Sequence, residues 1–267
     1  MHDKLTPELS KSAVVAIDVG NASIALGAWD QMRVRFSRRV PTGDRERFST
    51  ELQELCTRFP AGRPQAVVVA SVVPEAVPWI REAATELANR GIAVVGQSVP
   101  LPIPVAVREP QRVGVDRVCA AAAAFDRTAH ACTVIDFGTA VTVDLVDDAG
   151  TFLGGAILPG ARLQASALAR GTATLPEVDP APPEDPVGAD TVEAICSGIC
   201  HGIPGAVRAI VEQYATSLNH WPQVVATGGE LELFLPQCDF IDSSVPDLTV
   251  LGVGLAYAKH RPATSKP

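Results

Sequence analysis

The sequence predicts an α/β protein built from two duplicated lobes with a cleft between them. The same phrase occurs twice, as VVAIDVGNASIALGAWD around Asp18 and as CTVIDFGTAVTVDLVDD around Asp136. In each copy an apolar strand runs into Asp-x-Gly, and a second, alternating strand follows. The second copy starts nearly half the chain later, at a separation typical of one domain. Each half is therefore expected to hold a mixed five-stranded sheet flanked by helices.

The composition of the chain indicates compact globular domains and argues against nucleic acid and membranes as partners. The chain has 267 residues, of which 47% are hydrophobic and 19% are charged, as is typical of globular proteins. A net charge of −8 argues against a nucleic-acid-binding surface, which needs clustered Lys and Arg. The N-terminus lacks a signal-peptide pattern, and the longest apolar runs fall short of the roughly 20 residues that span a bilayer. We expect a cytoplasmic protein with neither nucleic acid nor membrane as a partner.

The six cysteines are scattered, mostly in apolar surroundings, and predict reduced core thiols rather than disulfides. Cys196, Cys200 and His201 form a Cys-x₃-Cys-His run that could suggest zinc. A zinc site usually has four ligands, and the sequence offers no second pair. Packing of this helix face in the core is the favoured interpretation.

Alternation and helical spacing predict the elements of the first lobe, residues 13–128, which follows a flexible extension at 1–12. Residues 99–110 are rich in proline and are expected to form a linker or a pocket wall. An alanine-rich helix should begin at Asp116. The other expected elements are strands at 13–19, 23–29, 34–40, 66–73 and 92–96 and helices at 44–59 and 75–90.

The second lobe, residues 129–260, repeats this plan and precedes a flexible tail at 261–267. A proline-rich acidic loop at 176–190 interrupts it. The expected strands are 132–136, 140–146, 151–157, 223–229 and 239–242, and the expected helices are 160–170, 190–217 and 249–258.

The repeated turns have the chemistry of a phosphate site. Glycine lets backbone N–H groups approach a phosphate closely, so Gly20-Asn21 and Gly138-Thr139 are suitable donors, together with the Thr139 hydroxyl. Mg²⁺ commonly uses one or two carboxylates plus phosphate oxygens, which makes Asp18 a candidate partner. A single Asp-x-Gly more often caps its own turn, and it is the duplication that favours the phosphate site here.

Six motifs occur in the order and spacing of a known family. They are DVGNAS at 18–23, GVDR at 114–117, DFGTAVT at 136–142, GGAILPG at 154–160, GADTVEAICSG at 188–198 and ATGG at 226–229. With them the chain resembles type III pantothenate kinase over nearly all of residues 14–258. The resemblance implies two actin-like, ribonuclease H-like lobes and a homodimer. It also implies ATP-dependent phosphorylation of pantothenate to 4'-phosphopantothenate, the first step of coenzyme A biosynthesis.

The resemblance also implies roles for individual residues. Asp116 is the catalytic base, and Asp136 holds a monovalent cation, K⁺ or NH₄⁺, while Asp18 would reach Mg²⁺ through ATP. The pantothenate-binding positions are Val107, Gly114, Val115, Asp116, Arg117 and Thr191. The ATP-binding positions are Asp18, Val19, Gly20, Asn21, Ala22, Ser23, Ile24, Ala25 and Thr139.

Physical chemistry supports the acceptor side of this assignment. A guanidinium group can form two parallel hydrogen bonds to a carboxylate, and pantothenate carries a carboxylate that Arg117 could bind in this way. In isolation, Asp116 would indicate only a helix N-terminal carboxylate. The chain departs from the family pattern at Ala22, where a hydroxyl residue is usual, and at Val107, where the family has tyrosine. Thr227-Gly228-Gly229 is equally consistent with an ordinary turn and with a contact to adenosine.

Two alternatives remain open from the sequence. One is a non-catalytic regulatory homologue of the family. The other is an actin-like phosphotransferase or phosphohydrolase with a different small acceptor, although the pairing of GVDR with GADT is not expected there.

Overall fold

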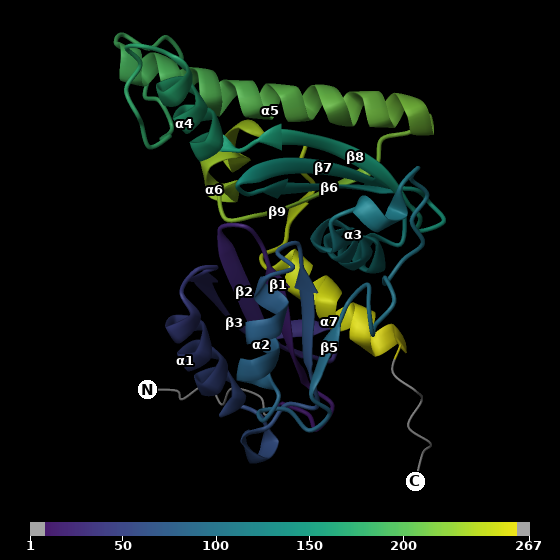
Figure 1. The fold of residues 1–267 in the computed structure, drawn as a ribbon. Helices are drawn as coiled ribbons and strands as arrows, with labels where there is room; N and C mark the ends of the chain where they lie inside the picture. Colours follow the sequence, from purple (N-terminus) through teal and green to yellow (C-terminus); the bar gives the residue numbers. More distant parts are fainter. Residues whose placement is uncertain (1–8, 261–267) are drawn as a thin grey trace, which may run out of the picture. The chain divides into compact units, whose positions relative to one another are not determined.

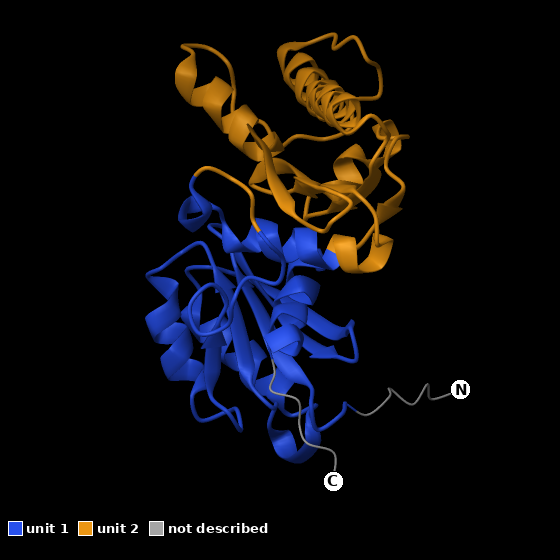
Figure 2. Cartoon of the chain, turned by 90° about the vertical axis from the view of Figure 1, so that its right-hand side faces the viewer, with its two compact units in different colours: residues 1–104, 109–123, 247–267 blue, residues 105–108, 124–246 orange. Residues whose placement is uncertain are grey.

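The computed structural model describes residues 9–260, which form two compact units (Figure 2). Unit 1 comprises residues up to 104, residues 109–123 and residues from 247 onward, and unit 2 comprises 105–108 and 124–246. The sequence-based division placed the last helix in the second lobe. In the structure this helix, α7 (Leu248–His260), packs on β1, β2 and β4 of unit 1.

The expected extension at 1–12 and tail at 261–267 lie largely outside the described residues. Residues 9–12 are described, and they are attached to unit 1. Leu9 is buried in its core, and Ser10 donates hydrogen bonds from its backbone N and its hydroxyl to the Asp30 carboxylate at 3.0 and 2.5 Å. The core of unit 1 therefore includes residues that precede the first strand.

Unit 1 is built on a mixed sheet in the order β3-β2-β1-β4-β5 (Figure 1). The first three strands are antiparallel neighbours, whereas β4 runs parallel to β1 and to β5. The strands are β1 (Val14–Val19), β2 (Ser23–Asp30), β3 (Arg33–Pro41), β4 (Val67–Ser71) and β5 (Ile92–Val94). Its helices are α1 (Arg45–Cys56), α2 (Ala76–Ala84), α7 and the first part of α3 (Val115–Thr128), with 3₁₀ turns at Pro60–Gly62 and Pro110–Arg112.

Strand β1 presents its two faces to different helices. Val15, Ile17 and Val19 point into the core that α1 and α2 cover. Because side chains alternate along a strand, Asp18 lies on the other face, the one on which α7 packs. The carboxylate is thereby placed at the end of a buried strand and beside a buried helix.

Unit 2 repeats the plan with a sheet in the order β10-β9-β6-β7-β8. Strand β6 pairs antiparallel with β7 and parallel with β9, just as β1 pairs antiparallel with β2 and parallel with β4. The strands are β6 (Cys132–Phe137), β7 (Ala140–Val146), β8 (Phe152–Pro159), β9 (Gln223–Thr227) and β10 (Ser243–Ser244). The helices are α4 (Ala161–Gly171), α5 (Thr191–Leu218) and α6 (Leu231–Phe234), with a 3₁₀ turn at Leu235–Gln237. The predicted duplicated fold is confirmed.

The last strand is shorter and later than the predicted 239–242. The carboxylate of Asp242 accepts a hydrogen bond from the Val224 N–H at 2.7 Å, and the Asp242 N–H donates to the Val224 carbonyl at 3.0 Å. This reciprocal pair holds the chain beside the start of β9, so ladder pairing begins only at Ser243.

Helix α5 has 28 residues and is long and apolar enough to cross a membrane by length and composition. No single apolar run in the sequence marks this helix, because Glu193, His201 and Arg208 interrupt it. Its apolar residues recur every three or four positions, and Ile199, Ile203 and Val207 pack into the core of unit 2. Figure 1 shows α5 lying along the sheet, as a core helix of a globular domain does. All six cysteines are buried and free, Cys196 and Cys200 among them.

Candidate active site

The turn between β1 and β2 in unit 1 is tight and is braced by the residue that follows β3. The Gly20 N–H donates to the Ser23 carbonyl at 3.0 Å, while the Thr42 hydroxyl donates to the Gly20 carbonyl at 2.7 Å. Asn21 and Ala22 are exposed at the tip, and the Asp18 side chain is half-buried below it. The turn thus presents its tip to solvent in a fixed backbone conformation. No motif in the sequence indicates Thr42, whose one signal is a hydroxyl directly after the third strand.

The corresponding turn in unit 2 lies between β6 and β7 and is braced by the residue before α4. The Gly160 N–H donates to the Thr139 carbonyl at 2.9 Å. A Cβ atom on Gly160 would overlap the Gly138 carbonyl oxygen and lie 2.7 Å from that of Thr139. Glycine at 160 therefore permits the start of α4 to contact the backbone of the turn directly. Asp136 is half-buried just before the turn.

The glycine pair after β9 docks on the same end of the sheet. Gly228 has a φ of 112°, which favours glycine, and a Cβ there would overlap the backbone of Phe137. The Glu230 N–H donates to the Phe137 carbonyl at 2.9 Å. Three glycine-containing segments, at 138, 160 and 228, thus meet at the carboxyl ends of β6 and β9. Ligands of open α/β sheets bind at such strand ends.

Replacing Gly160 with alanine tests this contact. The added methyl group meets backbone rather than a flexible side chain, so the turn or α4 must move. We expect the free energy of unfolding to fall by about 1–3 kcal/mol and the KM for the phosphate donor to rise. Gly171→Ala, at the exposed end of α4 with nothing within 4 Å, is the matched control and should leave both unchanged. Chemical denaturation and steady-state kinetics measure the two effects; a Gly160→Ala variant as stable as the wild type would contradict the contact.

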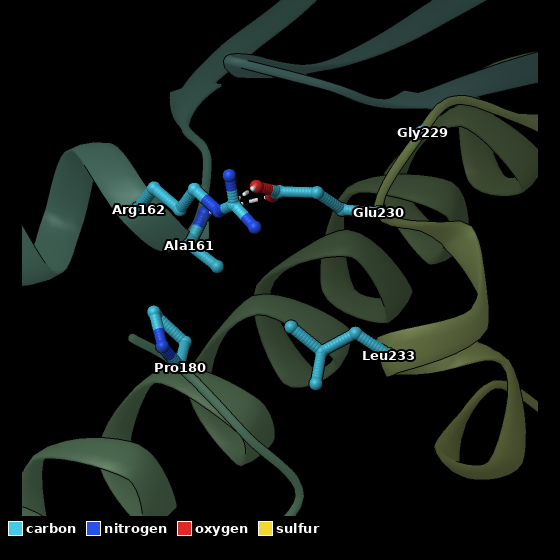
Figure 3. A pocket seen from close by; sticks show the side chains of 6 residues that line it. All are labelled: Ala161, Arg162, Pro180, Gly229, Glu230 and Leu233. Atoms are coloured by element: carbon cyan, nitrogen blue, oxygen red, sulfur yellow. Dashed lines mark hydrogen bonds and ion pairs between the residues drawn. The ribbon is translucent and has the colours of Figure 1, made fainter. Parts of the chain in front are cut away.

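A pocket of about 180 Å³ adjoins these segments (Figure 3). Figure 3 shows the side chains of Arg162 and Glu230 pointing toward each other from α4 and from the loop after β9. The Glu230 carboxylate accepts a hydrogen bond from the Ala161 N–H at 3.3 Å and lies 3.8 Å from Arg162 Nε, which is 3.4 Å from Asp179. Ala161, Arg162, Pro180, Gly229, Glu230 and Leu233 line the pocket.

Burial raises the pKa of Glu230 above the ordinary glutamate value, while the Ala161 N–H and the Arg162 guanidinium act in the opposite direction. The pocket therefore offers a carboxylate that can accept hydrogen bonds and a guanidinium that can donate them. Glu230 carried no motif signal in the sequence beyond its position after Gly-Gly.

The GVDR motif forms the start of α3 in unit 1. The Asp116 carboxylate accepts a hydrogen bond from the Arg117 N–H at 2.8 Å, and a Cβ on Gly114 would overlap that carboxylate. Burial raises the pKa of Asp116 above its ordinary value, although the Arg117 N–H and guanidinium partly counteract the burial. A carboxylate with a raised pKa in the first turn of a helix has the properties of a general base.

Asp18 and Asp116 both lie close enough to the thiol of Cys119 for their charges to act on it. Burial, with the Asp18 and Asp116 carboxylates adding to it, raises the pKa of this fully buried thiol well above the usual range. Of the predicted positions, Val107, Asp136, Thr139 and Thr191 belong to unit 2, and the rest belong to unit 1. Val107 lies 3.4 Å from the Cβ position of Gly154, and Thr191 is exposed at the start of α5. Neither is on the segments that carry Asp136 and Thr139.

Thr191 lines a second pocket, of about 390 Å³, between α4 and α5. The Asp190 carboxylate accepts a hydrogen bond from the Glu193 N–H at 2.9 Å and caps α5, which fixes Thr191 in its first turn. Leu168, Leu175, Ile195 and Ile199 give this pocket an apolar wall.

Within residues 9–260, the structure brings no three His, Cys, Asp or Glu side chains together in a way that could hold a metal ion. In place of such a cluster, each of the two turns offers one carboxylate as a cation ligand, Asp18 in unit 1 and Asp136 in unit 2. The Asp136 carboxylate lies 3.5 Å from the Cβ position of Gly138, so an oxygen ligand stands beside the turn. One carboxylate per turn suits a cation that arrives with phosphate oxygens and water rather than one caged by protein alone.

Comparison with known proteins gives a consistent picture. The family described as Type III pantothenate kinase matches residues 14–213. A type III pantothenate kinase from Anaeromyxobacter sp. (strain K) is 36% identical over 253 residues, covering 93% of this chain and 100% of that protein.

Two solved structures share the fold at low sequence identity. A conserved protein of the Baf family of transcriptional activators from Campylobacter jejuni is similar with a TM-score of 0.57 at 16% identity, over 92% of this chain and 98% of that one. The archaeal actin homologue Ta0583 has a TM-score of 0.52 at 15% identity, over 94% and 100% of the two chains.

Proposed function

The chain belongs to the type III pantothenate kinase family, and we propose how its own residues carry out the family's reaction. The enzyme uses ATP to phosphorylate pantothenate, which is the first step of coenzyme A biosynthesis. The observation that carries the proposal is the duplicated Asp-x-Gly turn, found once in each unit at the same place in the sheet order.

The two turns and the pocket of unit 2 bind ATP. The backbone of residues 19–23 and of Gly138-Thr139 holds the phosphates at the tips of the two turns, through the N–H groups of Asn21 and Thr139 and the Thr139 hydroxyl. The N–H groups of Gly20 and Gly138 close the turns by donating to the Ser23 and Ala140 carbonyls at 3.0 and 3.2 Å. The pocket at Arg162 and Glu230 takes the nucleoside, whose hydroxyl and amino groups can donate to the carboxylate and whose hydroxyl oxygens and ring nitrogen atoms can accept from the guanidinium. Ser23 supplies the hydroxyl that Ala22 lacks.

Asp18 would be the protein partner of the Mg²⁺ that accompanies ATP, and this ion would supply neutralisation of the charge on the phosphates. Asp136 would hold the monovalent cation, K⁺ or NH₄⁺. The support is chemical: each aspartate is half-buried at a turn whose backbone suits phosphate, and hard oxygen ligands suit both cations.

Asp116 and Arg117 serve the acceptor. Arg117 binds the carboxylate of pantothenate, and Asp116 orients the primary hydroxyl and takes its proton as the new P–O bond forms. An alcohol is far less acidic than a carboxylic acid, so the proton moves late. Gly114 and Val115 shape the start of α3 around this carboxylate.

Thr191 and Val107 complete the acceptor site in a cytoplasmic homodimer. Leu168 and Val192 lie beside Thr191 and are 37% and 46% exposed. Apolar side chains left exposed near a proposed site are typical of a protein–protein contact. Light scattering after gel filtration measures the dimer, and a monomer at micromolar concentration would contradict this part of the proposal.

The activity is tested with purified protein, ATP, Mg²⁺ and K⁺. Pantothenate should be converted to 4'-phosphopantothenate with one ADP released per product, as followed by a coupled assay and mass spectrometry. A screen of other small hydroxy acids distinguishes a different acceptor. Intact wild-type protein that releases no ADP with any acceptor would instead support the regulatory alternative.

A further inference from the structure

Two glycines of α7 lie where no larger residue fits. A Cβ atom on Gly252 would overlap the carbonyl group of Cys119 in α3 and lie 2.9 Å from its Cα atom. A Cβ atom on Gly254 would overlap the indole ring of Trp29 in β2. The two contacts differ in kind, because Trp29 offers a side chain whereas Cys119 offers helical backbone. At Gly252, α7 and α3 are therefore in direct backbone contact.

This contact lies one helical turn from Asp116. Residues three apart in a helix share a face, so Asp116 and Cys119 point to the same side of α3. The fully buried thiol of Cys119 is close enough to both Asp116 and Asp18 for their charges to act on it. The backbone contact and the two carboxylates thus occupy one small region of unit 1.

Helix α7 also fixes the other side of this region. It packs on β1, β2 and β4, and Asp18 lies near the end of β1 on the face that α7 covers. Val250, two residues before Gly252, lies 2.9 Å from the Cβ position of Gly27 in β2, so this part of α7 is pressed against the sheet as well. The thickness of α7 at Gly252 therefore sets how far α3 stands from the sheet.

We propose that Gly252 is a positioning residue that sets the separation of α3 from β1 and thereby places the Asp116 carboxylate relative to Asp18. The inference rests on the proposed role of Asp116 as base. A methyl group at 252 must push helical backbone aside, and in a close-packed interior that displacement is passed along α3 to its first turn. Misplacement of a catalytic group by about 1 Å is enough to cost on the order of 10² in rate.

Gly252→Ala is the test, and Gly254→Ala is its matched control in the same helix. We expect Gly252→Ala to lower kcat by about 10²-fold with little change in the KM for ATP. Gly254→Ala should lower the Tm and keep the kcat of the folded protein. Cys119→Ala should not rescue Gly252→Ala, because the contact is with backbone. Equal losses of kcat in the two glycine variants, or rescue by Cys119→Ala, would overturn the inference.

Crystal structures of the variants give a readout that needs no activity. In Gly252→Ala the Asp116 carboxylate should be displaced relative to Asp18, whereas in Gly254→Ala it should keep its place. An inactive wild type would refute the proposed function, and the displacement would still be measurable. If Gly252→Ala does not fold, it is introduced with Gly202→Ala, an exposed helical position with nothing within 4 Å where alanine should stabilise α5. An unmoved Asp116 in Gly252→Ala would refute the inference.

Discussion

Asp116→Asn is expected to lower kcat for pantothenate phosphorylation by roughly 10²-fold or more. Asparagine keeps the shape of the side chain and can still accept the hydrogen bond from the Arg117 N–H, so the start of α3 should be preserved. It cannot take a proton from the hydroxyl of pantothenate. Steady-state kinetics with saturating ATP measure the loss, and the KM for ATP should change little because the phosphate turns are untouched.

Asp44→Asn provides a matched control, because Asp44 is also a carboxylate at the start of a helix. Its side chain accepts a hydrogen bond from the Arg47 N–H at 3.0 Å and caps α1, a task that asparagine performs equally well. This variant should keep both its stability and its kcat. An Asp116→Asn enzyme as active as Asp44→Asn would rule out Asp116 as the base.

The same substitution at Asp116 should stabilise the fold at neutral pH. Burial raises the pKa of Asp116 in the folded protein above the ordinary value of 3.8. Because the folded pKa is raised, the contribution of Asp116 to the stability of the fold is fully present below pH 3.8. This contribution is lost as the pH rises through the folded pKa, since the folded protein must then hold a buried charge. The asparagine side chain stays neutral, so the advantage of Asp116→Asn in Tm should be present at neutral pH and absent at low pH. A catalytic carboxylate held at a cost to stability is common in active sites.

The sequence was sufficient to predict the parts of the fold that depend on local signals. Alternating apolar residues ending in Asp-x-Gly predicted both hairpins, and the structure pairs them in the same way, with Asp18 opposite Ala25 and Asp136 opposite Thr142. A turn that needs glycine and a strand buried on both faces each leave a readable pattern within about ten residues. The candidate site was therefore predictable at its two turns.

The remaining features depend on contacts between distant segments, which no local pattern specifies. Helix α7 follows the second repeat in sequence, yet it packs on β1. Thr42, directly after β3, braces the first turn, and Glu230 reaches the N-terminus of α4 across 69 positions of the chain. Gly160 belongs to the GGAILPG motif, but neither it nor Gly252 carries a local pattern that names the backbone it contacts. Tertiary packing gives these residues their roles.

Arg117→Ala is expected to lower kcat/KM for pantothenate by roughly 10- to 150-fold, the equivalent of losing a charge-assisted hydrogen bond worth about 1.5–3 kcal/mol. The guanidinium lies at the start of α3 beside Asp116, where it lowers the pKa of that carboxylate. Its removal should therefore also raise the pKa of Asp116 and move the acid limb of the pH–rate profile to higher pH. Lysine, which lacks the planar fork, should restore only part of the affinity. Measurements on the high-pH plateau separate binding of the substrate from ionisation of Asp116.

The alcohol analogue of pantothenate, in which a hydroxyl replaces the carboxylate, isolates the contact made by Arg117. This acceptor presents the same primary hydroxyl to Asp116 but gives the guanidinium no anion to bind. Wild-type enzyme should use it less well than pantothenate by about the factor that Arg117→Ala costs, and the variant should show little preference between the two acceptors. If Arg117→Ala reduced kcat/KM equally for both acceptors, the guanidinium would be supporting α3 or Asp116 rather than binding the substrate carboxylate. Only loss of discrimination between the two acceptors places the carboxylate of pantothenate at Arg117.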